Sequence, residues 1–289
     1  MTETRPLGRG ELRTLLAARG ITPRKAFGQN FVVDPNTVKR VARLAAVGAG
    51  DWVVEVGAGL GALTVALART GAQVTAVEID HRLVEELRSL VPGTVRVVEA
   101  DALHLDWDEV LATPNGPGAG WVLVANLPYN VATPLIVEIL KAVPAIRRML
   151  VIVQAEVGAR LAAVPGSRSY GAVSVRVAYF ATARVVGRVP PEVFYPRPKV
   201  DSVLVAIERR DRPVVDPGLV NFDEIDELVR AGFTGRRKML RRALGAMVTP
   251  EAFEAAEVDA RLRAERLDVV TWGKLAACRR SIAGSPPPS

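Results

Sequence analysis

One short segment, Asn126–Tyr129 (Asn-Leu-Pro-Tyr), carries side chains suited to holding a flat ring that bears an amino group. It follows an apolar run, Trp121–Ala125, which predicts a strand that ends where the segment begins. The Asn126 side-chain oxygen and a nearby backbone carbonyl can accept both protons of an exocyclic amine. Pro128 fixes the backbone and has no competing N–H, and Tyr129 offers a face for stacking. This chemistry suits methylation of a base amino group, whereas the purely structural interpretation is a strand followed by a Pro turn.

The elements that position this segment form an α/β pattern from about residue 51 to 208. Apolar runs typical of strands alternate with segments of helical spacing, which predicts a mostly parallel, Rossmann-like sheet with helices on both faces. The last two strands have no clear helix between them, so we expect an antiparallel pair at the sheet edge. The predicted strands are Asp51–Val56, Gln73–Ile79, Thr94–Glu99, Trp121–Ala125, Met149–Gln154, Val173–Arg184 and Ser202–Ile207, and the first two helices are Leu60–Arg69 and His81–Leu90.

A glycine-rich loop, Glu55–Gly61, ends the first predicted strand and opens a helix. Glycines such as Gly57 and Gly59 let the backbone turn tightly and approach a ligand closely. Glu78 lies 21 residues beyond Gly57 and ends the second strand, where an acid can accept hydrogen bonds from both hydroxyls of a ribose. The loop and the acid together predict a nucleoside-containing cofactor.

Asp101 and Ala102 follow the third predicted strand. A carboxylate there can accept a hydrogen bond from the amino group of a cofactor adenine, and the small Ala102 leaves room for the ring; a helix N-cap is the structural alternative for Asp101. The glycine loop, Glu78, Asp101 and Asn126 thus stand at the ends of four successive strands. Ligands of open α/β sheets bind at the carboxyl ends of the strands, so we expect one shared pocket.

The glycine spacing separates two cofactor classes. Nicotinamide dehydrogenases use G-x-G-x-x-G to cradle a pyrophosphate, whereas the spacing here is G-x-G-x-G. S-adenosylmethionine has no phosphate, only an amino-acid tail and a nucleoside. The loop therefore favours S-adenosylmethionine, and a dehydrogenase would leave Asn126–Tyr129 without a role.

The charge of the chain indicates a polyanionic partner. The net charge of its 289 residues is +7, and such an excess favours nucleic acid. One basic cluster lies before Asn30 and includes Arg24 and Lys25. The second consists of Arg236, Arg237, Lys238, Arg241 and Arg242.

Composition excludes several other classes. Cys278 is the only cysteine, which excludes an internal disulfide and fits a reducing cytoplasm. The only histidines are His81 and His104, so we expect no metal site and no histidine-based triad. No apolar run approaches the length of a membrane span, and the charged N-terminus lacks an apolar signal core. We therefore expect a cytoplasmic monomer without membrane contact.

The pattern changes after Arg212, where helical segments replace strands. The predicted helices are Asp223–Gly232, Arg236–Ala246, Pro250–Ala256, Asp259–Arg266 and Val270–Ile282. We expect a methyltransferase domain over residues 1–212 and a small all-α domain over 213–289 that docks RNA or the ribosome. Gly284–Ser289 is expected to be a disordered tail.

Together these motifs resemble the small-subunit ribosomal RNA adenine N6,N6-dimethyltransferases, and the resemblance covers nearly the whole chain. Further motifs that carry it are Phe27–Phe31 (FGQNF), Glu78–Asp80 (EID), Val153–Val157 (VQAEV), Phe194–Ser202 (FYPRPKVDS) and Phe233–Lys238 (FTGRRK). The resemblance implies that the first of these, Phe27–Phe31, packs over the bound cofactor. One departure is Ala58, where many relatives have Pro. The Gly-Ala-Gly turn should still fit.

The resemblance implies roles for residues that their types alone do not assign. Asn30, Val32, Gly57, Glu78, Asp101 and Asn126 would contact S-adenosylmethionine. Tyr129 and Phe194 would sandwich the target adenine, although Phe194 as a core aromatic is the structural alternative. The amine would attack the methyl in line while it donates to the Asn126 oxygen and to the Leu127 or Pro128 carbonyl. The basic clusters would hold small-subunit rRNA in an immature small ribosomal subunit, and two adjacent adenines near its 3′ end would be dimethylated.

Two alternatives stay open beside this interpretation. Large-subunit rRNA adenine methyltransferases of the antibiotic-resistance type share the pocket motifs, although Gln154-Ala155-Glu156 and the basic stretch from Arg236 to Leu240 favour the small-subunit type. A ribosome-assembly factor could use the same surface mainly for binding. Loss of methylation with retained subunit binding in Tyr129→Ala would separate catalysis from binding.

Overall fold

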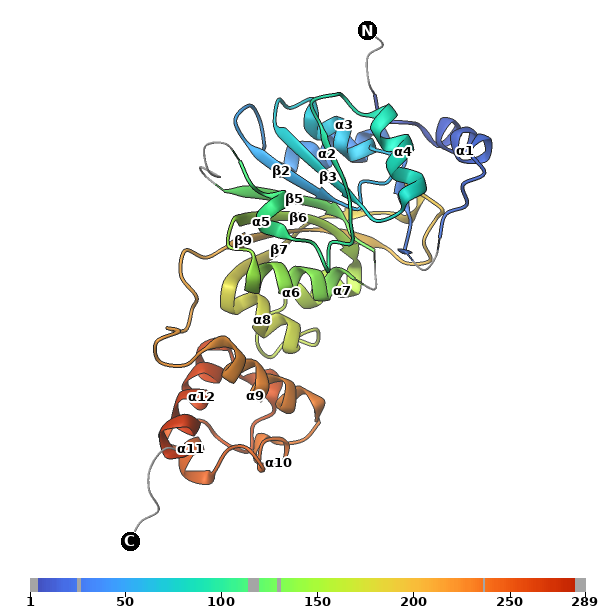
Figure 1. Ribbon diagram of the computed structural model, residues 1–289. Coiled ribbons are helices and arrows are strands. Elements are labelled where there is room, and N and C mark those ends of the chain that lie inside the picture. Colours follow the sequence, from blue (N-terminus) through green and yellow to red (C-terminus); the bar gives the residue numbers. More distant parts are fainter. Residues whose placement is uncertain (1–4, 25–26, 114–119, 129–130, 236, 284–289) are drawn as a thin grey trace. The chain divides into compact units, whose positions relative to one another are not determined.

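The chain folds into two compact units in the computed structural model, which describes residues 5–24, 27–113, 120–128, 131–235 and 237–283 (Figure 1). The first unit comprises residues 1–158 and 184–209, and the second comprises residues 159–183 and 210–289. The sequence placed the boundary once, after Arg212, whereas the structure assigns residues 159–183 to the second unit as well. No helix in the described ranges is long and apolar enough to span a membrane.

A seven-stranded sheet organises the first unit. Its order is β4-β3-β2-β5-β6-β9-β7, with the first five strands parallel and β9 antiparallel to β6. The strands are β2 (Trp52–Val56), β3 (Gln73–Glu78), β4 (Arg96–Glu99), β5 (Trp121–Asn126), β6 (Ile146–Gln154), β7 (Ala181–Val189) and β9 (Ser202–Arg209). The mostly parallel, Rossmann-like fold that the sequence predicts is therefore confirmed, with β9 and β7 adjacent at one edge.

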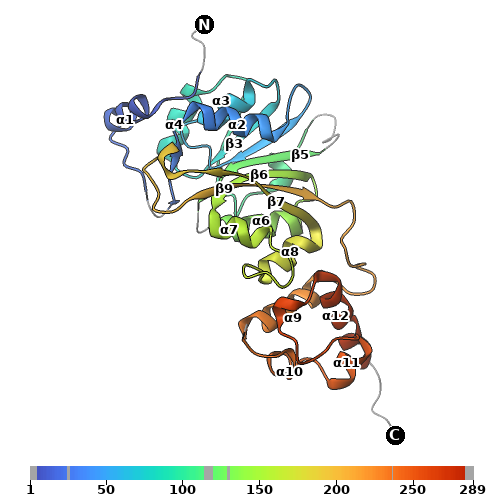
Figure 2. The same cartoon turned by 180° about the vertical axis from the view of Figure 1, so that it is seen from behind.

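Helices cover both faces of this sheet, with α2, α3 and α4 on one side and α6 on the other (Figures 1 and 2). Buried valines and leucines on both faces of β2 and β5 explain the double cover. The helices of this part of the chain are α1 (Arg9–Ala18), α2 (Pro35–Ala45), α3 (Ala62–Ala68), α4 (His81–Leu90), α5 (Trp107–Val110), α6 (Ala132–Ala142) and α7 (Ala155–Leu161).

A two-stranded ribbon lies outside the main sheet. Here β1 (Phe31–Val32) pairs antiparallel with β8 (Phe194–Tyr195), directly after a 3₁₀ turn at Pro191–Val193. The ribbon joins the segment before α2 to a segment about 160 residues later in the chain. It therefore fixes the N-terminal region against the sheet.

The second unit is helical, with α8 (Ala172–Phe180), α9 (Phe222–Thr234), α10 (Leu240–Ala243), α11 (Pro250–Ala255), a 3₁₀ turn at Ala264–Arg266 and α12 (Val269–Ala283). Three sequence predictions are wrong here. Residues 172–180 form a helix rather than the start of a strand, and most of Asp259–Arg266 is not helical. Of the helix predicted over Arg236–Ala246, only Leu240–Ala243 is helical among the described residues. The tail Gly284–Ser289 lies outside the described residues.

Packing explains why α8 is helical and belongs to this unit. Tyr170, Val175 and Tyr179 are buried in the same apolar cluster as Leu228 and Trp272. A buried Asp226 carboxylate in α9 receives hydrogen bonds from Arg176 at 2.5 Å and from Arg230 at 2.8 Å. The alternating valines of this segment suit a strand, but tertiary contacts outweigh that local preference.

Candidate functional site

Two neighbouring cavities open at the carboxyl ends of β2, β3 and β5. The first is lined by the glycine loop, by residues 27–32, and by Glu55, Glu78 and Asn126. The second is lined by Asp101, Ala102, Leu103 and residues of α6, and the two share Phe27, Gly57, Ile79 and Pro128. Their empty volumes are about 740 and 760 Å³, open mouths included, and their walls are mostly apolar with a few polar groups, as in small-molecule sites.

The structure brings every predicted cofactor residue to the wall of one of these cavities. Six line the first cavity and three line the second, with Gly57 in both. The set is Asn30, Val32, Gly57, Gly59, Glu78, Asp101, Ala102 and Asn126. They come from distant parts of the sequence and meet because parallel strands end at one edge of the sheet.

The glycine loop needs its glycines for two reasons. Gly57, Gly59 and Gly61 have φ values of +74°, +58° and +79°, a region that other residues rarely adopt. A Cβ on Gly59 would also lie 2.9 Å from the Phe31 ring. The loop therefore packs directly against β1, and its residues from Gly57 to Leu60 line the first cavity.

Glu78 is buried and braced by the backbone. Its carboxylate accepts hydrogen bonds from the N–H groups of Gly59 at 2.7 Å, Asp80 at 3.0 Å and Ile79 at 3.1 Å. Burial is the largest influence on this carboxyl and raises its pKa, against the opposing effect of the three N–H groups. Two of the bonds end on Oε1, so Oε2 keeps more capacity to accept a ribose hydroxyl.

Glu55 is a second buried carboxylate beside the same cavity. Burial raises its pKa to about 8. Its Oε2 atom and the Thr64 hydroxyl are both buried without a hydrogen-bond partner in the described part of the chain. An orphaned buried acceptor is costly, and a ligand ammonium would satisfy it. The first cavity thus fits the amino-acid tail of S-adenosylmethionine.

Asn126 is held by a backbone carbonyl from the N-terminal region. Its Nδ2 donates to the Asn30 carbonyl at 2.7 Å. With the amide nitrogen committed to that bond, the amide oxygen is the acceptor left for a substrate amine. The orientation that the proposed chemistry needs is therefore built into the fold.

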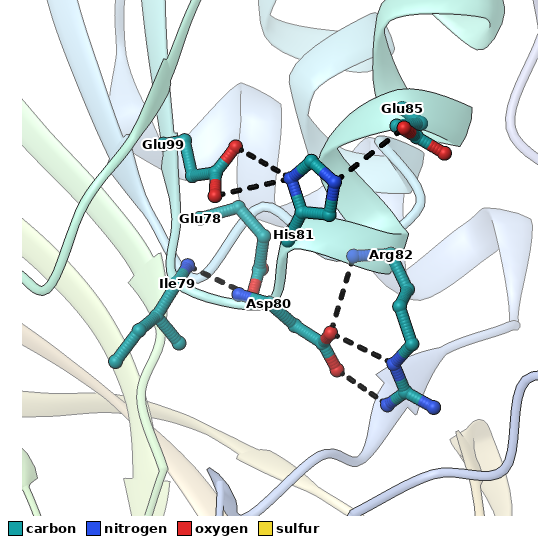
Figure 3. A network of polar contacts seen from close by, with 7 residues as sticks. All are labelled: Glu78, Ile79, Asp80, His81, Arg82, Glu85 and Glu99. Carbon is teal, nitrogen blue, oxygen red and sulfur yellow. Dashed lines mark hydrogen bonds and ion pairs between the residues drawn. The ribbon is translucent and has the colours of Figure 1, made fainter.

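The segment 27–31 forms a strap over the first cavity, anchored at Gln29. Gln29 Nε2 donates to Asp80 Oδ2 at 2.9 Å, and Arg82 donates to both oxygens of Asp80, at 3.0 and 2.7 Å. Figure 3 shows the Asp80–Arg82 pair at the end of β3. The Arg82 guanidinium, ahead of other influences, lowers the pKa of Asp80. Asp80 is thus ionised at neutral pH and holds the strap through a charge-assisted bond.

Asp101 presents an ionised carboxylate to the second cavity. It accepts a hydrogen bond from the Leu103 N–H at 2.9 Å and lies 3.0 Å from His104 Nδ1. The Leu103 N–H is the largest influence that lowers its pKa. It can therefore accept a further bond from an adenine amino group while it caps the following turn.

The predicted catalytic residues differ in their placement. Pro128 lines both cavities, whereas Leu127 is buried and donates its N–H to the Ile152 carbonyl at 3.1 Å. Tyr129 lies outside the described residues. The Pro128 carbonyl accepts from the N–H groups of Val131 and Ala132, at 3.2 and 3.1 Å. The Leu127 and Pro128 carbonyls were the two candidate acceptors for the substrate amine. Because the Pro128 carbonyl is already engaged, we assign that role to the Leu127 carbonyl.

Phe194 does not line either cavity. Its side chain is 1% exposed and belongs to the core cluster that includes Val32, Val124 and Leu204. Pairing of β8 with β1 turns this ring inward. In this conformation it cannot stack on an adenine, and its position matches the structural alternative considered for it.

Comparison with known proteins identifies the family. The family model described as ribosomal RNA adenine dimethylase matches residues 20–277. The chain is 45% identical to ribosomal RNA small subunit methyltransferase A of Leifsonia xyli, over 96% of this chain and 100% of that protein. It is 42% identical to the protein of the same name from Moorella thermoacetica, over 92% and 96%. The chain belongs to the ribosomal RNA adenine dimethylase family.

Two solved structures share the fold. A dimethyladenosine transferase from Plasmodium falciparum is 25% identical, with a TM-score of 0.69 over 84% of this chain and 94% of that one. The 23S rRNA methyltransferase ErmE is 26% identical, with a TM-score of 0.65 over 87% and 100%. The fold alone therefore does not separate a 23S rRNA methyltransferase from this chain, whereas the identity to the small-subunit methyltransferases is much higher. Like the other members of the dimethylase family, the protein is an S-adenosylmethionine-dependent methyltransferase.

The basic clusters of this dimethylase lie on separate units. Arg24 is exposed on the first unit, with its guanidinium 5.5 Å from the centre of the Phe27 ring. Arg237, Lys238, Arg241 and Arg242 are exposed on the second unit. Lys25 and Arg236, also predicted to bind RNA, lie outside the described residues. In the described part of the chain no group of three or more His, Cys, Asp or Glu side chains could hold a metal ion.

Sequence reasoning missed several residues of the dimethylase site. Phe27 and Gln29 belong to the motif that the resemblance places over the cofactor, and they do line the first cavity. Neither they nor Glu55 and Asp80, which also stand inside motifs of the resemblance, were given an individual role. Ile79 is 42% exposed and lines both cavities. An apolar residue between two acids at a strand end could have indicated contact with a ligand.

Proposed function

We propose that the protein transfers methyl groups from S-adenosylmethionine to the N6 amino groups of two adjacent adenines near the 3′ end of small-subunit rRNA, to give N6,N6-dimethyladenosine. The observation that carries the proposal is the orientation of Asn126. Its amide nitrogen is held by the Asn30 carbonyl at 2.7 Å, beside a cavity that the glycine loop and Glu78 also line.

The first cavity receives the amino-acid tail and ribose of the cofactor. Glu55 Oε2 would accept from the ammonium, Glu78 Oε2 would accept from a ribose hydroxyl, and the glycine loop would border the tail. The second cavity receives the adenine, with Asp101 accepting from its amino group and Ala102 leaving room for the ring. When bound, S-adenosylmethionine supplies an electrophilic methyl group on a positively charged sulfur.

Asn126 and the Leu127 carbonyl prepare the target amine. Two acceptors on its two protons draw the nitrogen toward tetrahedral geometry and localise its lone pair. No general base is required beforehand, because the proton becomes acidic only as the new bond forms. The chain therefore contributes chiefly by positioning, which supplies about 7–11 kcal/mol in favourable cases.

The target adenine must leave its stack, at a cost of a few kcal/mol. Tyr129 is proposed to stack on the extruded ring, which returns ~1–3 kcal/mol. Stacking by Phe194 would require its ring to leave the core, so we do not retain that role. Arg24, Lys25 and the cluster from Arg236 to Arg242 hold rRNA phosphates and set where the enzyme docks.

The wider setting is part of the same proposal. The substrate is an immature small ribosomal subunit in the cytoplasm, and the enzyme acts as a monomer. The first unit carries out the methyl transfer, and the second docks on RNA. A large-subunit target is the main rival, because ErmE shares the fold.

A methyl-transfer assay with labelled S-adenosylmethionine tests the proposal. Its substrates are unmethylated small subunits, naked small-subunit rRNA and large-subunit rRNA, with modified bases mapped. We expect dimethyladenosine at adjacent adenines of the small subunit. Label in large-subunit rRNA would assign the rival function.

Tyr129→Ala divides catalysis from assembly. We expect this variant to lose methylation and to keep subunit binding. Equal methylation by the variant and the wild type would remove the stacking role. Cofactor binding without label in any substrate would leave a binding role in ribosome assembly.

A further inference from the structure

A groove on the first unit lies between α1 and β8, outside both cofactor cavities. α1 contributes Arg13, Thr14 and Leu16 to its lining, and β8 contributes Tyr195. We name it the α1 groove, lined by Gly10, Arg13, Thr14, Leu16, Ala17, the loop residues Ile21, Thr22 and Pro23, and Tyr195. Figures 1 and 2 both show α1 at the outer side of this unit, beyond α4.

Two contacts fix α1 in this place. Arg9 donates to the carbonyls of Glu192 and Phe194, the latter at 3.1 Å, which ties α1 to β8. Arg19 forms an ion pair with Glu86 of α4 at 2.8 Å. The apolar side of α1 is also anchored, because Leu12 and Leu16 are buried with Phe31 and Leu83. The groove is therefore a stable feature of the fold.

Arg13 differs from its two neighbours on α1. Arg9 and Arg19 are both engaged, whereas Arg13 is exposed and has no ion pair or hydrogen bond within the described ranges. None of the residues that line the α1 groove is Asp or Glu. An unneutralised guanidinium in a groove without carboxylates favours an anionic ligand.

Tyr195 adds an aromatic surface to this charge. It is partly exposed, lines the groove, and its hydroxyl has no hydrogen-bond partner among the described residues. A phosphate-binding cation opposite an aromatic ring is the combination by which proteins hold single-stranded nucleic acid, since every base offers a face for stacking. Leu16 and Ile21 are buried at this groove and give it an apolar base.

The α1 groove is linked to the reaction site through the β1–β8 ribbon. Tyr195 pairs with Phe31 across the β1–β8 ribbon, and Phe31 follows Asn30, whose carbonyl orients Asn126. An adenine extruded into the site leaves its neighbouring nucleotides on the adjacent surface. We propose that the α1 groove binds a nucleotide that flanks the target adenine, with its base on Tyr195 and its phosphate on Arg13. This inference rests on the proposed function, since the flanking nucleotide belongs to the same rRNA substrate.

The test measures RNA affinity of the full chain against salt concentration. The first probe is a fluorescent RNA hairpin whose loop carries two adjacent adenosines with flanking nucleotides, and the second has abasic residues at the flanking positions. We expect Tyr195→Leu to bind the first RNA roughly tenfold more weakly than the wild type and the abasic RNA equally well. Tyr195→Phe, which keeps the ring, should bind both like the wild type.

Arg13→Ala tests the phosphate contact. The slope of log affinity against log salt should fall by about 0.7 for one contact to a single strand. Arg43→Ala is the matched control, because Arg43 is an exposed arginine of α2 without a side-chain partner in the described part of the chain. It should leave the slope unchanged. Unchanged S-adenosylmethionine affinity in each variant shows that the fold is intact.

Wild-type affinity and slope in both Arg13→Ala and Tyr195→Leu would overturn the proposal. Equal weakening of Tyr195→Leu on both RNAs would overturn the stacking contact. A different result would contradict the proposed function alone. If the wild type binds these RNAs through the groove but methylates neither RNA nor small subunits, the groove is a nucleotide site and the proposed methyl transfer is wrong.

Discussion

The Asn126 side chain donates its amide nitrogen to the Asn30 carbonyl at 2.7 Å, across 96 residues of sequence. This bond joins the end of β5 to the strap over the first cavity. It places the two parts of the site, the acceptor for the target amine and the cover of the cofactor cavity, in one hydrogen-bonded unit. Cofactor binding and amine orientation should therefore respond together to changes in the strap.

Asn126→Ala should lower kcat by at least about 100-fold, because the amine loses one of its acceptors and its position. Asn30→Ala is the comparison, since it keeps the backbone carbonyl that holds Asn126 and removes only a side chain at the cofactor cavity. It should weaken S-adenosylmethionine binding and keep kcat near the wild-type value at saturating cofactor. Single-turnover methylation of small subunits measures both variants. A normal rate in Asn126→Ala would remove Asn126 from the mechanism.

Gln29→Ala should weaken S-adenosylmethionine binding about five- to tenfold, because the strap loses a hydrogen bond to an ionised carboxylate. Gln29→Glu should weaken cofactor binding further. In the wild type the Gln29 amide donates to the Asp80 carboxylate at 2.9 Å, and the variant replaces this donor by a second carboxylate that repels Asp80. Isothermal titration of the cofactor measures both. If Gln29→Glu bound the cofactor as well as the wild type, the strap would not depend on this anchor.

Glu55→Gln should change how stability depends on pH. The folded pKa of Glu55 is raised by burial from 4.5 to about 8, so the folded protein holds this proton more tightly than the unfolded chain. The resulting stability is fully present below pH ~4.5 and is lost as the pH rises toward ~8. Between pH 5 and 8 the wild type should therefore lose ~2–4 kcal/mol of unfolding free energy that Glu55→Gln, which has no proton to release at this position, does not lose.

Denaturant unfolding of both proteins at intervals from pH 5 to 8, without cofactor, checks this expectation. Parallel curves would show that Glu55 keeps an ordinary pKa. In the same variant the cofactor should bind more weakly at pH 8, because a neutral amide replaces the carboxylate that pairs with its ammonium.

Gly59→Ala should cost several kcal/mol and abolish tight cofactor binding. The new Cβ combines a φ of +58° with an approach of 2.9 Å to the Phe31 ring. Gly20→Ala is a matched control, because Gly20 has a φ of +62° and no atom within 4 Å of a Cβ. It should cost only the strain of the left-handed region, ~1–2 kcal/mol. Equal thermal shifts in the two variants would show that the contact with Phe31 is unimportant.

Joint replacement of Arg237, Lys238 and Arg242 by Ala should weaken small-subunit binding and lower its salt slope by ~2–3, since each phosphate contact adds about 0.7–0.9. These side chains are exposed on the second unit, so S-adenosylmethionine affinity should not change. Filter binding at several salt concentrations measures the slope. An unchanged slope would place RNA docking elsewhere on the chain.

Local sequence patterns were enough to predict the parallel part of the sheet and the residues that line the two cofactor cavities. Strands such as Gln73–Glu78 and Trp121–Asn126 lie close to their predicted bounds, because buried parallel strands appear as continuous apolar runs. The glycine loop, Glu78, Asp101 and Asn126 were predictable as one pocket because parallel topology brings strand ends together. These features depend on local pattern and on one general rule of sheet topology.

The tertiary structure decided what depends on contacts between distant residues. The valines of 172–180 alternate as in a strand, yet packing of Val175 and Tyr179 with Leu228 makes the segment a helix. Pairing of β8 with β1 turns Phe194 into the core and leaves Tyr195 at the α1 groove. The Asn30 carbonyl orients Asn126, and no local pattern specifies that partner. Whether a given side chain is buried depends on the residues that surround it in space, and the spacing of residues along the chain does not specify those neighbours.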